Sequence, residues 1–234
     1  MKDNKKLYSF TAGWVLLIAC LTFAYFTLVD PLKYVARGYT DKGYLGYLCE
    51  TYTAQDTKTT QWTLTILTVA LLVLAIAMFR QSKLLLLIGT GLDLALIAYQ
   101  FHLMGLGKVD PEWWNSYNTL GLINTIILPA LVVLMLLLMA VALMLNKPVA
   151  GIFGIIAIAL AALGFLLELV LNIGPLMSET WKGSDLLFTF SPFARTNMME
   201  IGRDTTPIAY LTRAGIGVMI ALWGMNCCKE SAEK

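Results

Sequence analysis

The chain has 234 residues and a formal net charge of +2, with 58% hydrophobic but only 14% charged residues. Soluble domains contain about 25% charged residues, and a chain of this length cannot bury so much apolar surface. The composition therefore excludes a soluble globular protein and indicates an integral membrane protein. No basic patch interleaved with aromatic residues is present, which argues against a nucleic-acid partner.

Six apolar segments are long enough to cross a bilayer, whose hydrocarbon core of about 30 Å needs about 20 helical residues. The first follows a lysine-rich start and lacks the short core and small-residue cleavage site of a signal peptide, so we expect it to be retained. The sequence predicts an all-α fold, a polytopic integral membrane protein with six transmembrane helices in one domain over residues 1–234. The predicted helices span residues 10–29, 60–79, 84–106, 120–145, 149–172 and 207–226.

The connections differ in length and charge. Residues 80–83 and 146–148 form two very short basic turns, whereas residues 30–59, 107–119 and 173–206 form three long connections. The turns and both ends of the chain carry as many cations as the long connections, over roughly a third as many residues. Because cytoplasmic segments are enriched in Lys and Arg, this density predicts that both termini are cytoplasmic, in a plasma or inner membrane.

The segment 149–172 carries small residues at helical spacing that lead to a carboxylate. Segment 207–226 has a partly matching stripe, and small residues allow close helix packing in lipid. Glu168 and Arg213 lie at depths that differ by only about 3 Å, so we expect them to pair in the outer leaflet. A structural ion pair, a functional site and unpaired side chains that reach the headgroups are the alternatives. The first stripe comprises Gly154, Ala157, Ala161, Gly164, Glu168 and Asn172, and the second comprises Tyr210, Arg213, Gly217, Ile220 and Gly224.

Asp93 lies near the middle of the segment 84–106, where a charge costs about 2.5–3.5 kcal/mol on insertion scales. It shares a helix face with Gly89, Leu96 and Gln100, so this face should look into the protein. Asp93 is either an acid that exchanges a proton or a cation during transport, or a neutral acid bonded to a neighbouring helix. Gln100 and Asn124 complete the candidate ligand-binding or coupling residues.

Nothing in the sequence indicates catalysis or a cofactor. His102 is the single histidine, which excludes bis-histidine haem and di-iron histidine motifs within the chain. No zinc spacing, P-loop or dinucleotide fingerprint is present. No serine lies in the six segments, so an intramembrane serine hydrolase would lack a nucleophile. We therefore expect neither a metal nor a catalytic set, and an enzyme is the weakest of the functional hypotheses.

Two hypotheses remain. The arrangement of six helices with both ends inside and three long outer connections resembles the substrate-binding membrane subunits of vitamin-uptake transporters, which implies binding of a small solute. The first hypothesis is solute binding or transport through an outward-facing polar site between segments 84–106, 149–172 and 207–226. The second is a non-catalytic structural or scaffold subunit, whose small-residue faces contact a membrane-protein partner or a second copy.

Overall fold

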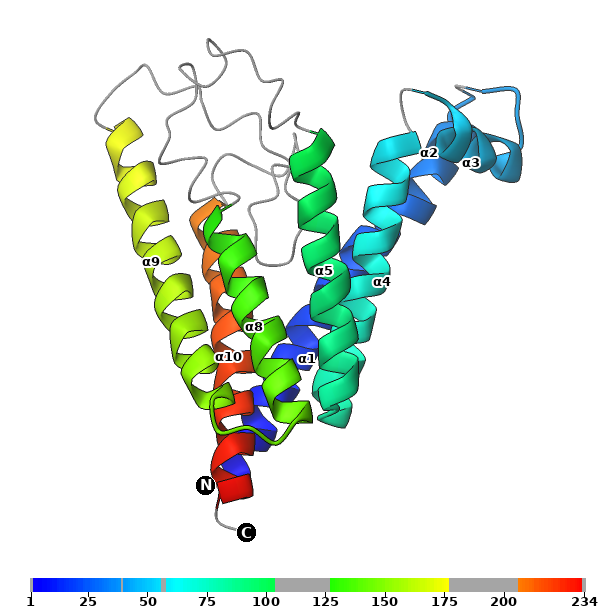
Figure 1. Cartoon of the computed structure of the whole chain (residues 1–234). Coiled ribbons are helices and arrows are strands. Elements are labelled where there is room, and N and C mark those ends of the chain that lie inside the picture. Colours follow the sequence, from blue (N-terminus) through cyan, green and yellow to red (C-terminus); the bar gives the residue numbers. More distant parts are fainter. Residues whose placement is uncertain (1, 39, 56–57, 104–126, 177–205, 233–234) are drawn as a thin grey trace.

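The computed structural model describes residues 2–38, 40–55, 58–103, 127–176 and 206–232, and every regular element in this part of the chain is helical (Figure 1). The predicted all-α fold is thus confirmed. Within the described residues, three helical stretches are long and apolar enough to cross a membrane: Asn4–Ala36, Gln61–Arg80 and Ala150–Leu167. Two shorter apolar helices, Leu128–Met144 and Ala214–Lys229, accompany them.

The first helix is longer than the predicted segment 10–29. It comprises α1 (Lys2–Ala24), a π-helical stretch η1 (Tyr25–Val29) and α2 (Asp30–Ala36) in one continuous run. Pro31 explains the change of pitch, because its ring crowds the carbonyl group four residues earlier and it donates no backbone hydrogen bond. A π-turn widens the helix at this point. The helix can therefore continue through Asp30-Pro31, where the sequence suggested an end.

The predicted outer connection 30–59 also contains a helix, α3 (Tyr44–Thr53). α3 folds back on the end of the first helix through tyrosine contacts. The rings of Tyr34 and Tyr47 stack with centroids 6.0 Å apart, and the Tyr44 hydroxyl donates to the Leu28 carbonyl at 2.8 Å. α3 thus forms a small packed unit with the end of the first helix.

The remaining helices are α4 (Lys58–Arg80), α5 (Lys83–Leu103), α8 (Leu128–Met144), α9 (Ala150–Leu176) and α10 (Thr206–Ala232), each overlapping one predicted segment. α1 packs against α4 and α10, and α5 packs between α4 and α8. α9 packs against α8 and α10, which also contact each other. Figure 1 shows these helices converging at the end that holds both termini and the short turns, and diverging toward the other end. We call these the inner end and the outer end.

The two short turns have the same backbone design. Each first helix closes with a residue in the left-handed region, Gln81 (φ 51°) and Asn146 (φ 53°). The following amide then bonds to a carbonyl five residues back: Ser82 N–H to Ala77 O at 2.9 Å, and Lys147 N–H to Ala142 O at 2.8 Å. This is the Schellman arrangement. The two predicted short turns therefore join α4 to α5 and α8 to α9 as helical hairpins with matching turns.

Lys83 joins the two hairpins. Its Nζ donates to the Leu143 carbonyl at 3.0 Å and to Asn146 Oδ1 at 3.4 Å. Leu143 lies in the last turn of α8, where carbonyl groups lack helical donors and the helix dipole favours a cation. A lysine that the sequence assigns only to a basic turn thus caps the neighbouring helix.

Glycines set the distances between helices in the inner half. A Cβ added to Gly89 of α5 would lie 2.6 Å from the Leu74 side chain of α4, and 3.3 Å from the Leu74 backbone nitrogen. A Cβ added to Gly154 of α9 would lie 2.7 Å from Met225 Cγ of α10. One added to Gly224 of α10 would lie 2.5 Å from Met139 Sδ of α8. Each glycine is a notch that accepts a neighbouring side chain.

Replacing Gly89 with alanine tests this packing. Because Leu74 is fully buried and its backbone is close, G89A should lower the free energy of unfolding by about 1–3 kcal/mol through overpacking. The matched control is G215A, since a Cβ at Gly215 meets nothing within 4 Å and alanine is the better helix former. Thermal unfolding in detergent, followed by circular dichroism, checks both. Equal stability of the two variants would contradict the claim that Leu74 packs closely against Gly89.

Candidate functional site

Asp93 lies at the centre of the packed face of α5. Residues three, four and seven positions apart share a helix face, and the members of this face are all buried. They are Leu86, Gly89, Thr90, Asp93, Leu96 and Ile97. The exposed fraction of Asp93 is 0%. Within the described residues, Asp93 is the only fully buried side chain of acidic or basic type.

Contacts between neighbouring helices give the depth of Asp93 in the bundle. Gly89 meets Leu74 across the α4–α5 hairpin, so Asp93, one turn further out, is level with Ala70 of α4. A Cβ on Gly91 would lie 3.9 Å from Leu137 Cδ1 of α8, which places Asp93 level with Met135. Ala70 is fully buried and belongs to the apolar core, and Met135 packs near it. Asp93 therefore lies deep in the bundle, level with apolar residues of α4 and α8.

Thr90, one turn inward of Asp93, is the other buried polar residue on this face. Its hydroxyl donates within its own helix, to the Leu86 carbonyl at 2.7 Å and the Leu87 carbonyl at 3.2 Å. Such back-bonding satisfies a threonine without involving another helix. Thr90 thus provides a buried polar neighbour that can be changed as a control for Asp93.

α9 packs against α10, but the α10 residues that meet Gly154 are Ala221 and Met225, which lie beside the predicted stripe, and the stripe residue Gly224 meets Met139 of α8. The predicted contact between the two small-residue stripes stays a prediction. Gly154, Ala157, Ala161 and Gly164 are buried on α9, and Gly217, Ile220 and Gly224 are buried on α10. Gly154 also approaches the backbone of α10, since its added Cβ would lie 3.4 Å from the Ala221 carbonyl oxygen. In the described part of the chain, this small-residue face of α9 is therefore filled from within the protein.

Glu168 and Arg213 lie on these two helices, but their side chains are outside the described residues. The Gly154–Met225 contact fixes the register of the antiparallel helices. Glu168 is 14 residues outward of Gly154, and Arg213 is 12 residues outward of Met225. At 1.5 Å per residue the two Cα atoms differ in depth by about 3 Å. This register is compatible with the predicted pair.

The same reasoning relates Asp93 to Arg213. Met139 fits against Gly224 on the parallel helices α8 and α10, so Met135, and with it Asp93, is level with Ile220. Arg213 is seven residues outward of Ile220, or about 10 Å. Gln100 lies seven residues outward of Asp93 on the same face of α5, with its side chain outside the described residues. Asn124 lies entirely outside them.

Trp223 is a residue that sequence analysis did not single out. Its side chain is fully buried in the core, three residues inward of the level that Ile220 shares with Asp93. Its indole N–H donates no hydrogen bond to any group that the structure describes, although buried tryptophans usually find an acceptor. Trp223 lies near the end of an apolar segment, a position typical of an interfacial tryptophan. The sequence therefore carries no signal that its side chain is buried in the core.

Metal chemistry gains no support from the described residues, which contain no group of three His, Cys, Asp or Glu side chains placed to hold a metal ion. Comparisons with protein-family models, curated proteins and solved structures found no match to this chain. The function must therefore be argued from the residues themselves, and Asp93 is the best-placed of them.

The stability of a D93N variant separates a functional acid from a structural one. Asparagine keeps the shape and hydrogen-bonding capacity of the side chain but removes the cost of a buried charge. We expect D93N to unfold at the same temperature as the native protein or higher. The free energy of unfolding of T90V should lie within about 1 kcal/mol of the native value. Thermal unfolding in detergent at pH 7 measures both. A loss of about 3–5 kcal/mol in D93N would instead indicate a structural ion pair.

Proposed function

We propose that this chain is a six-helix polytopic membrane protein, with both termini cytoplasmic, that binds or transports a small solute through a polar site open to the outer side. In this proposal Asp93 is the deepest residue of the site. Gln100, Glu168 and Arg213 lie further out along α5, α9 and α10, and Asn124 belongs to the same outer region. The solute exchanges with a proton or a cation held by the Asp93 carboxyl group.

Exposed apolar side chains support the placement in a bilayer. Helices α1 and α9 present aliphatic residues that are more than half exposed, which a soluble protein rarely tolerates in continuous stripes. They include Ile18, Leu21, Ile152, Ile155, Leu163 and Leu166. Lipid tails are the solvent that matches such a surface.

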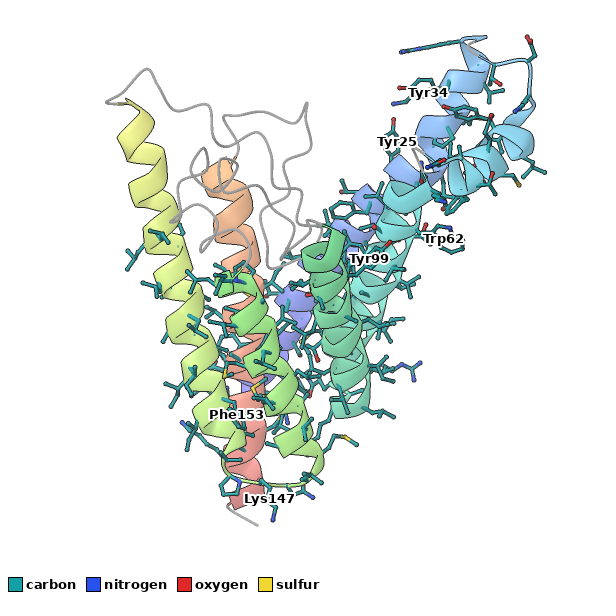
Figure 2. The ribbon with its side chains drawn as sticks, turned by 45° about the horizontal axis from the view of Figure 1, so that its top comes forward. Tyr25, Tyr34, Trp62, Tyr99, Lys147 and Phe153 are labelled. Atoms are coloured by element: carbon teal, nitrogen blue, oxygen red, sulfur yellow. The ribbon has the colours of Figure 1, made fainter. Side chains whose placement is uncertain are left out.

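Aromatic residues support a specific position of the helices along the bilayer normal. Figure 2 shows Tyr25, Trp62 and Tyr99 toward the outer end and Lys147 at the inner end. The exposed fractions of these three rings are 40%, 53% and 43%, as expected for an aromatic belt at the headgroups. On α4, Trp62 and Arg80 are 18 residues apart, or about 27 Å. This separation matches a hydrocarbon core of about 30 Å.

The observation that carries the proposal is the burial of Asp93 at mid-membrane depth. Its level on α4 is Ala70, 10 residues from Arg80 and 8 residues from Trp62, so about 15 Å and 12 Å from the two interfaces. A carboxyl group at this depth costs free energy and is usually retained for function.

Co-purification tests the proposal against the scaffold alternative. Native protein, D93N and T90V are extracted in a mild detergent, and the small molecules and proteins that accompany each are identified by mass spectrometry. We expect a small solute with native protein and T90V, at near-stoichiometric amounts, and at least a tenfold reduction with D93N. Loss of a protein partner from D93N, with no solute in any sample, would contradict the proposal and favour a scaffold subunit.

A further inference from the structure

A groove of about 460 Å³ opens on the surface where the start of α1 meets the end of α4. It combines a polar floor with an aromatic wall, and none of its lining residues is acidic. The lining residues are Lys6, Leu7, Ser9, Phe10, Phe79 and Gln81. Both helices belong to stretches that are long and apolar enough to span a membrane. The groove therefore lies at the inner end of two candidate spans.

The floor is held by a short chain of hydrogen bonds. Gln81 Nε2 donates to Ser9 Oγ at 3.2 Å, and the Ser9 hydroxyl donates to the Lys6 carbonyl at 3.1 Å. This connection ties the turn after α4 to the first turns of α1, across 72 residues of sequence. The polar floor is thus a defined tertiary feature of the fold, built from two separate segments.

Phe10 and Phe79 form the wall, and Trp14 next to the groove packs edge to face against both rings. Ring centroids are 6.0 Å apart for Phe10 and Trp14, 6.2 Å for Phe10 and Phe79, and 5.7 Å for Trp14 and Phe79. Their exposed fractions are 57%, 48% and 39% for Phe10, Trp14 and Phe79. Gly13 lets the Phe79 ring lie against α1, because a Cβ there would be 2.9 Å from it. Together the rings form an apolar surface that extends outward from the groove.

Two cations of the described residues lie at or next to the groove. Lys6 lines it, and Arg80 lies between the lining residues Phe79 and Gln81 in the sequence. Both side chains are exposed. The cations and the hydrogen-bonding floor lie next to exposed aromatic rings. An anionic headgroup matches the cationic, polar part of this surface, and the acyl chain joined to it matches the rings.

We propose that this groove binds an anionic phospholipid of the inner leaflet. Lys6 and Arg80 contact the headgroup phosphate, and the acyl chain lies along Phe10, Trp14 and Phe79. The inference uses the membrane placement proposed above but is independent of the solute site at Asp93. Bound lipid would bridge α1 and the α4–α5 turn, and so stabilise the inner end.

Native mass spectrometry in detergent tests this site with phosphatidylglycerol, phosphatidylcholine of the same acyl chains, and inorganic phosphate as probes. We expect phosphatidylglycerol to bind at least fivefold more tightly than phosphatidylcholine. K6Q and R80Q should each weaken it about fivefold, since each basic residue near a surface contributes about 1 kcal/mol. The matched control is K147Q, which removes an exposed cation from the other inner turn and should change binding less than twofold.

Three results would overturn the proposal. They are equal binding of the two lipids, an equal loss in K147Q, and displacement of phosphatidylglycerol by millimolar inorganic phosphate, which would mean that the groove binds phosphate without the acyl chain. F10A is an independent test of the acyl-chain contact, because it should weaken the binding of phosphatidylglycerol while leaving all exposed cations in place. No solute is added in these assays, so their failure would leave the Asp93 site untouched.

Discussion

Helices in a bilayer gain no hydrophobic free energy by packing, because lipid tails are as apolar as leucine. Close van der Waals contact must hold them, and in this chain the contact depends on glycine. Gly89 admits Leu74, Gly154 admits Met225, and Gly224 admits Met139, so α5, α4, α9, α10 and α8 are joined by notches at similar depths. Lys83 adds a polar lock between the two hairpin turns. The inner half is thereby fixed as one packed body.

This rigid inner half gives Asp93 its significance. Asp93 lies just outward of Gly89 on the same face of α5, and its side chain is fully buried. The glycine contacts lie on its inner side, and the helix ribbons diverge toward the outer end (Figure 1). In the proposed function, an acid at this depth responds to a solute that arrives from the outer side. We therefore interpret its burial as part of a function.

Sequence patterns predicted more of the fold than of the site. Length and hydropathy located the six apolar helices, and helical spacing assigned Asp93 and the small residues of α9 to packed faces. The continuation of the first helix to Ala36 was not predictable, because Asp30-Pro31 usually ends a helix and the compensating π-turn depends on local geometry. The contact of Lys83 with α8 and the burial of Trp223 depend on tertiary neighbours, which no single-chain pattern contains. The side chains of Glu168 and Arg213 lie outside the described residues, so their pairing stays a prediction.

The most direct test of this account is the accessibility of the Asp93 face from each side of the membrane. In a variant whose four native cysteines are serines, I97C places a thiol one turn outward of Asp93, and L86C places one seven residues inward on the same face. Ile97 is buried in this structure, so its modification requires the outer half to open. The account predicts that a membrane-impermeant methanethiosulfonate slowly modifies I97C, from the outer side only, and modifies L86C from neither side. Modification of I97C from the inner side, or no modification from either side, would contradict an outward-facing site.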